Sequence, residues 1–359
     1  MVNSTNMSYL NSLLLANIRS SYIKDSLNLY IIIPMGVIGT ILNLITLIIL
    51  SKKTFNDVNI YKIMKVYSLN SLLITFFISF IFLFSPYVLL ELSKSIIGRI
   101  YICDLVNWFY LFFFLFGNCL DILLNLERAL EYSNGYAKIK QLSPYLICFI
   151  ILILCIIIHI PSDLAVLHTP DNELYVKLRL CYATTFATNS ITKMILIVSY
   201  IIEGPFLMVL AVGSNILAYI SYKSFIKRKQ ELIINNRERG VELTENETRK
   251  QAKTEIMNLK LLIMTIYLTI FSIISHLLQF GSQLIIFVFP SYFSLTVYVW
   301  SQYIYVFIIV LKHFCTIFFY YNFNLKFKRR LLSFICKKIE INRSSNMPTN
   351  NIHRRRHFT

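Results

Sequence analysis

Residues 101–132 have the sequence YICDLVNWFYLFFFLFGNCLDILLNLERALEY, an apolar run that begins near Cys103 and ends on the pair Glu127-Arg128. At about 1.5 Å per residue, a helix from Cys103 to Arg128 would be roughly 37 Å long, slightly more than the ~30 Å hydrocarbon core of a bilayer. A thiol is therefore expected at one membrane face and a guanidinium at the other. Because structural disulfides persist on the oxidising side of a membrane, Cys103 should face outward and Arg128 inward.

The composition of the 359 residues is that of a membrane protein. Hydrophobic residues make up 56% of the chain and charged residues 15%, and the mean hydropathy is +0.62, which is too apolar for a soluble domain. The net charge of +17 does not indicate nucleic-acid binding, because the basic residues lie between apolar runs. The seven cysteines show no metal-ligand spacing. No carboxylate pair, activated nucleophile or phosphate-binding glycine loop is present, so the sequence predicts no enzyme, metal or cofactor.

Seven apolar segments follow a polar stretch of residues 1–28. Each approaches or exceeds the roughly 20 residues that a spanning helix needs. The segments cover residues 29–50, 66–90, 101–126, 143–161, 194–221, 258–289 and 296–321. We therefore predict an all-α membrane protein, with a seven-transmembrane helix bundle over residues 29–325.

The distribution of basic residues predicts the orientation. The connections 51–65, 127–142, 222–260 and 322–359 contain 27 Lys and Arg residues, the opposite set contains 7, and Lys312 lies within the seventh segment. Because cytoplasmic loops collect basic residues, residues 1–28 should be extracellular and the tail cytoplasmic, in a multi-pass protein of the plasma membrane. Glycosylation sequons at Asn3 and Asn6 agree with this orientation.

Cys181 lies in the connection 162–192, which this topology places outside. It is the only other cysteine expected on that side, so a Cys103–Cys181 disulfide is the natural pairing. Such a bond would hold the loop over the outer end of the third helix and limit its freedom. The loop would then form a lid over an outer pocket.

Residues 326–338 are predicted to form a short amphipathic helix at the inner interface. One face carries cations, and the other carries apolar residues at helical spacing, namely Phe327, Leu331, Phe334 and Ile335. Cys336 near its end is a candidate for S-palmitoylation, with an unmodified thiol as the alternative. The polar residues 339–359 are predicted to be a disordered cytoplasmic tail.

Several motifs fall at the spacing of one receptor family. They are Asn43 in the first segment, Cys103, Glu127-Arg128-Ala129 in place of Asp-Arg-Tyr, Cys181, Pro205, and Phe327-Lys328 at the start of the short helix. The departures are Ser71 for an aspartate, Ser275-His276-Leu277 for Trp-x-Pro, and Tyr320 or Tyr321 as the tyrosine of an otherwise absent Asn-Pro-x-x-Tyr. Over residues 29–336 the chain resembles a rhodopsin-like G-protein-coupled receptor, of a diverged invertebrate type similar to FMRFamide and myosuppressin receptors.

This resemblance implies an extracellular ligand, a heterotrimeric G protein and arrestin as partners. It also implies that Glu127, Arg128 and Tyr320 or Tyr321 belong to the activation switch. Arg128 would change partner on activation, leaving Glu127 or an acid near the foot of the sixth helix such as Glu255.

Asp121 lies two turns before Arg128, and an ionisable group at that depth is costly unless it is paired or hydrated. We hypothesise that Asp121 takes over part of the role of the acid missing at Ser71, in a polar core with Asn43, Asn118 and Asn125. The alternative is a local pairing of Asp121 with one of these amides. Lys312 is one or two residues from the place of a retinal-binding lysine, and a snorkelling or paired lysine is the favoured interpretation.

The ligand class is narrowed by Tyr110, which stands where amine receptors carry an aspartate and so disfavours a simple amine. Candidate pocket residues near the outer ends are Asp104, Trp108, Tyr110, Glu203 and Trp300. Acidic and aromatic groups together favour a cationic, aromatic peptide such as an Arg-Phe-amide. The alternatives are a chemosensory receptor for a small molecule and a seven-helix transporter, although no internal repeat is found and only Pro205 interrupts a segment centrally.

Overall fold

The computed structural model describes residues 23, 26–83, 107–133, 143–164, 166–167, 182–183, 190–238, 245–288 and 295–345. Its elements in chain order are the π-helical turn η1 (Asn28–Ile32), α2 (Ile33–Leu50), the short helix η2 (Lys53–Phe55), α3 (Asn59–Leu83), α6 (Asn107–Tyr132), α8 (Pro144–Leu164), the strands β1 (Val166–Leu167) and β2 (Tyr182–Ala183), α11 (Ser190–Ile201), the π-helical turn η4 (Ile202–Phe206), α12 (Leu207–Glu238), α13 (Glu245–Val288), α14 (Leu295–Phe323) and α15 (Leu325–Ser345). The described part of each apolar segment is helical, and the fifth segment is divided among α11, η4 and α12.

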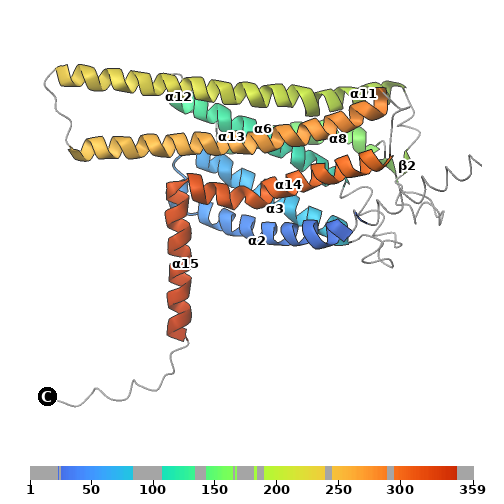
Figure 1. Cartoon of the computed structure of the whole chain (residues 1–359), viewed down its shortest axis with the longest axis horizontal. Helices are drawn as coiled ribbons and strands as arrows, with labels where there is room; N and C mark the ends of the chain where they lie inside the picture. Colours follow the sequence, from blue (N-terminus) through green and yellow to red (C-terminus); the bar gives the residue numbers. More distant parts are fainter. Residues whose placement is uncertain are drawn as a thin grey trace, which may run out of the picture.

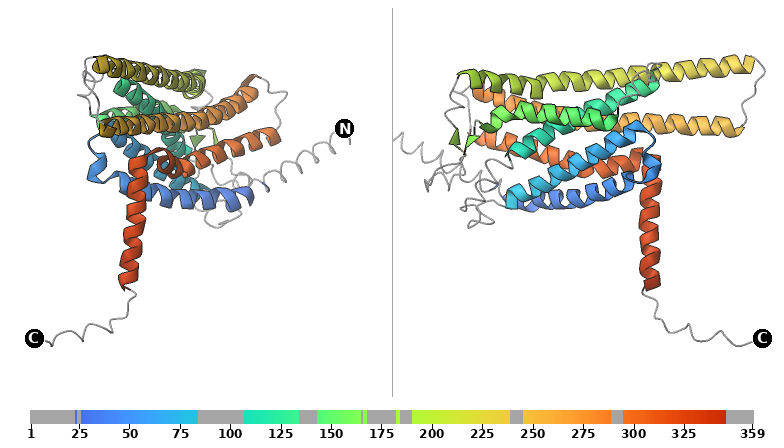
Figure 2. Two further views of the ribbon diagram at one scale, coloured as in Figure 1. Left: turned by 60° about the vertical axis from the view of Figure 1, so that its left-hand side comes forward. Right: turned by 180° about the vertical axis from the view of Figure 1, so that it is seen from behind.

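The long helices run alongside one another as a bundle (Figures 1 and 2). At one end α12 and α13 project beyond the other helices, and α15 turns away from α14 and extends sideways out of the bundle. At the opposite end β1 and β2 form an antiparallel pair, with Val166 opposite Ala183 and Leu167 opposite Tyr182. The amphipathic helix is longer than predicted, because α15 continues past residue 338 to Ser345.

The outward faces of the bundle are apolar. Ile41 is 54% exposed, Phe149 57% and Val209 66%. Within the described ranges, four helices are long and apolar enough to cross a membrane, at Asn28–Leu50, Ile197–Asn235, Thr254–Leu278 and Tyr303–Phe323, and Pro144–Ile160 is a shorter apolar helix. Apolar surface on this scale requires a lipid solvent, so the chain is a multi-pass membrane protein.

Pro205 explains the change of helix type within the fifth apolar segment. It lies inside η4, where the helix between α11 and α12 widens to a π turn. Proline has no backbone N–H and its ring collides with the preceding turn, so an unbroken α-helix cannot pass through this position. The widened turn accommodates the proline while the helix continues.

The described part of the bundle core has three apolar clusters, and polar residues lie between the two larger ones. We call the end of the bundle at which α15 begins the inner end, and the opposite end the outer end. The inner cluster includes Met64, Tyr67, Leu124, Leu268 and Tyr320. The outer cluster includes Ile74, Ile78, Phe114, Tyr305 and Ile309. Between the two clusters α3 carries Ser71, and α14 carries Lys312 and His313, all fully buried. The polar layer is therefore sealed from both ends by apolar packing.

Helices α2 and α3 approach closely because glycines face the contact. A methyl group at Gly36 would overlap Ser79 Oγ and lie 3.1 Å from the Thr75 carbonyl oxygen. Ser79 is itself held in place, since its hydroxyl donates to that same carbonyl at 2.7 Å. Gly36 is therefore required by packing.

Gly36→Ala should destabilise the protein by about 1–3 kcal/mol, because the added methyl overpacks a tight helix contact. Gly213→Ala is the matched control, since nothing lies within 4 Å of a methyl group there. Thermal unfolding of the purified variants in detergent would measure the difference. Equal melting temperatures for the two variants would show that the α2–α3 contact tolerates a side chain.

Candidate functional site: a buried polar layer and the inner end of the bundle

Lys312 of α14 is the centre of the polar layer. Its ammonium donates to Asp121 Oδ2 at 2.5 Å, to Ser272 Oγ at 2.7 Å and to Asn118 Oδ1 at 3.3 Å. Ser272 also donates to Asp121 Oδ2 at 2.8 Å. All three N–H groups of the ammonium are thereby used. Lys312 and Asp121 are 1% and 3% exposed, so this is a buried ion pair that joins α6, α13 and α14.

The Lys312–Asp121 pair bears on the local-pairing alternative for Asp121, whereas the hypothesised role of this carboxylate in place of the acid missing at Ser71 stays a prediction. The carboxylate is not held by one amide alone, because its partners are Lys312 and Ser272. Asn118 joins the same cluster through the lysine. The interpretation of Lys312 as a paired lysine is confirmed, although its partner was not predicted.

Asn43 and Ser71 meet at His313, which follows Lys312 on α14. Asn43 Nδ2 donates to the His313 carbonyl oxygen at 3.0 Å, and Ser71 Oγ lies 2.9 Å from His313 Nδ1. Asn125 lies in a separate group, since its Nδ2 donates to Ser214 at 3.4 Å and to Thr269 at 3.2 Å. The five predicted core residues thus occupy three groups, two of which are joined along α14.

Arg128 lies at the inner end of α6 and is 1% exposed. Its Nη1 donates to Glu131 Oε2 at 2.8 Å. Within the described part of the chain, Nε and Nη2 of this guanidinium have no hydrogen-bond partner. The buried Arg128 guanidinium therefore has one acidic partner, Glu131, and retains N–H donors that another acceptor could bind.

The elements around Arg128 are tied together by further contacts. Arg228 Nη2 of α12 donates to the Tyr132 carbonyl oxygen at 2.6 Å, and Tyr132 donates its hydroxyl to the Asn258 carbonyl oxygen at 3.5 Å. Burial raises the pKa of Tyr132 to about 12, against an opposing effect of the nearby Arg128 cation, so the phenol keeps its proton. These contacts join α6, α12 and α13 over the guanidinium.

Glu131, which the sequence analysis did not single out, is the acid that pairs with Arg128. The spacing of three residues on one helix is the signal that could have identified it. Glu255 was expected as an alternative partner, but it pairs with Lys229 of α12 at 2.6 Å. Glu127 is half-buried beside Arg128 on α6.

The two tyrosines near the end of α14 point in different directions. Tyr320 is fully buried, and its hydroxyl donates to the Met64 carbonyl oxygen at 3.5 Å. Tyr321 is half-buried, with the Lys328 ammonium 4.7 Å from the centre of its ring. Tyr320 is therefore the residue that belongs to the inner cluster.

The fold was compared with known proteins. No family model and no curated protein sequence matches the chain. The crystal structure of squid rhodopsin is similar, with a TM-score of 0.64 and 14% sequence identity, over 86% of this chain and 84% of that one. The chain has the rhodopsin fold. This confirms the predicted seven-helix bundle.

The structure describes the side chains of two predicted ligand-pocket residues, Glu203 and Trp300. Glu203 in η4 is 8% exposed, and its Oε1 lies 3.4 Å from His159 Nδ1 of α8. Trp300 of α14 is half-buried, and its ring lies 5.9 Å from that of Tyr303. These two residues thus have different neighbours, on different helices.

The other predicted outer residues cannot be placed in the same way. Trp108 and Tyr110 lie on α6, and their side chains are outside the described part. Residues outside the described ranges altogether are Asn3, Asn6, Cys103, Asp104 and Cys181. Cys336 is exposed on α15 with a free thiol. The predicted disulfide, glycosylation and palmitoylation stay predictions.

Proposed function

We propose that this chain is a G-protein-coupled receptor, which converts binding of an extracellular ligand into activation of a heterotrimeric G protein. The observation that carries the proposal is Arg128, a buried cation at the inner end of α6 whose Nε and Nη2 have no hydrogen-bond partner among the described residues. A guanidinium stays charged at any physiological pH, so it needs a partner whenever the site is dry. The rhodopsin fold supports the same conclusion.

The contacts over Arg128 indicate how it would become accessible. Ligand binding in the outer half would favour a conformation in which the inner ends of α12 and α13 move away from α6. The Arg228–Tyr132 and Lys229–Glu255 contacts would then open or rearrange. The uncovered guanidinium could bind the free carbonyl groups at the C-terminal end of a helix in the partner, where negative partial charge accumulates.

The orientation belongs to the same proposal. The basic connections would lie in the cytosol and residues 1–28 outside, with Asn3 and Asn6 glycosylated and Cys103 bonded to Cys181. The ends of α12 and α13 that project from the bundle in Figure 1 would then present a charged surface to the cytosol. Arrestin would bind the same face.

We further propose a peptide ligand with cationic and aromatic groups, in a plasma-membrane receptor. Glu203 supports this, because a buried carboxylate in the outer half of the bundle can pair with a ligand cation. His159 is its described neighbour, with Nδ1 3.4 Å from Glu203 Oε1.

The test is a cell-based screen of the full-length chain with G-protein activation as the readout. One panel contains peptides ending in Arg-Phe-amide, and a second contains small odorants. Activation by a peptide, lost in Arg128→Gln, is the expected result. Activation by odorants alone would identify a chemosensory receptor. Solute uptake without activation of any G protein would identify a transporter and overturn the proposal.

A further inference from the structure

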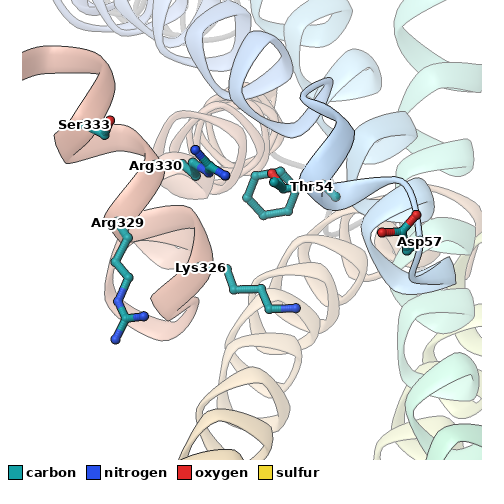
Figure 3. Close-up of a pocket in the computed structure, with 7 residues that line it drawn as sticks. Thr54, Asp57, Lys326, Arg329, Arg330 and Ser333 are labelled. Carbon is teal, nitrogen blue, oxygen red and sulfur yellow. The ribbon is translucent and has the colours of Figure 1, made fainter. Parts of the chain in front are cut away.

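A cavity of about 530 Å³ lies at the end of the bundle where α2 and α14 finish (Figure 3). Its lining includes Thr54 and Asp57, from the connection between α2 and α3, and Lys326, Arg329, Arg330 and Ser333 of α15. Neither the polar layer nor the proposed coupling surface uses this cavity. Its chemistry is strongly cationic, with three basic residues and one acid.

The basic residues form one face of α15. Their spacing of three, four and seven residues, from Lys326 to Ser333, places them in one stripe along the helix. Phe327, on a neighbouring face, is fully buried and its ring lies 5.6 Å from that of Tyr320. This apolar anchor fixes the helix, and with it the direction of the cationic stripe.

The guanidinium groups of this stripe are not neutralised. Arg329 and Arg330 are exposed, and neither has an acidic partner within the described residues. Figure 3 shows Lys326 and Arg330 extending toward the Thr54 and Asp57 side, whereas Arg329 extends away from it. The Lys326 ammonium lies 5.7 Å from the centre of the Tyr61 ring, so its charge is positioned without being cancelled.

The position of the cavity relative to the bilayer limits what can reach it. Helix α15 extends sideways from the end of the bundle, transverse to the spanning helices (Figure 1), and therefore along the membrane surface. It also exposes Leu332 and Ile335, 43% and 45% accessible, as an interfacial helix does. A cavity beside such a helix lies at the depth of lipid headgroups.

We propose that this cavity binds the headgroup of a phosphoinositide, an anionic lipid that carries phosphate monoesters. Arginine forks match phosphate oxygens in a bidentate arrangement, and the hydroxyls of Thr54 and Ser333 add further donors. The volume suits a phosphorylated ring better than a single phosphate. The inference rests on the proposed orientation, since such lipids and the negative surface potential belong to the cytoplasmic leaflet.

The test uses the purified full-length protein in nanodiscs of phosphatidylcholine, with a fluorescent phosphatidylinositol bisphosphate added. The pocket variant is Lys326→Gln with Arg330→Gln. The matched control is Lys223→Gln with Lys227→Gln, which removes two exposed cations from α12 at the same end of the bundle. Arg330→Gln alone serves as a second variant if the double substitution reduces thermal stability.

We expect the pocket variant to bind the lipid about thirtyfold more weakly, from roughly a fivefold loss for each cation near the membrane surface. The control should bind as the unmodified protein does. An equal loss of lipid affinity in the pocket variant and the control, or no loss in either, would contradict the proposal that the lipid binds in this cavity. Equally tight binding of phosphatidylserine, or of soluble inositol trisphosphate, would overturn the assignment to a phosphoinositide.

Lipid binding in a nanodisc requires neither a G protein nor a known agonist. A chain that binds the lipid but activates no G protein would contradict the proposed function alone. A chain that signals but shows no pocket-dependent binding would contradict the lipid site alone. The receptor function and the lipid site can therefore each be contradicted without the other.

Discussion

Asp121→Asn and Lys312→Met should each lower the free energy of unfolding by about 3–5 kcal/mol, whereas the double substitution should recover most of that loss. Either single change leaves an unpaired polar or charged group between two apolar clusters, where Lys312 is 1% exposed. Removing both partners leaves no charge to compensate. The measurement is the fraction of purified protein that is still monodisperse after heating. Additive losses in the double variant would show that the two side chains do not stabilise each other.

The same pair should also restrain signalling, because it is a buried ion pair that joins α6 to α14. Asp121→Asn is therefore expected to raise agonist-independent G-protein activation. Ser272→Ala is the control, since it removes one hydrogen bond from the ammonium and keeps both charges. If Asp121→Asn leaves both basal and agonist-driven signalling unchanged, the polar layer supports the fold without taking part in switching.

Arg128→Gln should reduce G-protein activation at least about thirtyfold, the effect of losing a buried charged contact worth 2 kcal/mol or more. Agonist binding in the outer half should change little, because Arg128 lies at the inner end of α6. Glu131→Gln makes the opposite change. It keeps the Arg128 guanidinium and removes the negative charge that pairs with it, so agonist-independent G-protein activation should rise. Nucleotide exchange on a purified G protein would measure both variants.

The control for Arg128 is Arg228→Gln, which removes a guanidinium that contacts a backbone carbonyl of the same site. It should alter basal activation modestly and leave maximal activation intact. A comparable loss of maximal activation in Arg128→Gln and Arg228→Gln would indicate that inner-end charge in general, and not Arg128, carries coupling.

The helices were predictable because a spanning segment must satisfy its backbone hydrogen bonds internally and cover itself with apolar side chains. The polar layer was partly predictable for the same reason. Asp121, Asn118 and Ser71 interrupt apolar runs, and a polar residue in such a run has to face a partner. Pro205 likewise marked the place where the fifth spanning helix departs from α geometry.

The partners of these residues could not be predicted, since they depend on the rotation of each helix about its own axis. Lys312 and Asp121 are on different helices, and only the packed bundle brings their charges to 2.5 Å. His313 follows Lys312 in the sequence but faces Ser71 of α3. The basic cavity was missed for a similar reason: Thr54 and Arg330 are far apart in the chain and meet only because the first part of α15 lies beside the connection between α2 and α3.

The π turn at η4 has a mechanical consequence for the inner end of the molecule. Helix α12 continues from Leu207 to Glu238, so its far tip lies about 48 Å from the turn at 1.5 Å per residue. A rotation of about 5° at η4 would therefore displace that tip by roughly 4 Å. The widened turn lies in the outer half, where a ligand would bind. A small rotation of the backbone there would produce a larger displacement at the far end of α12.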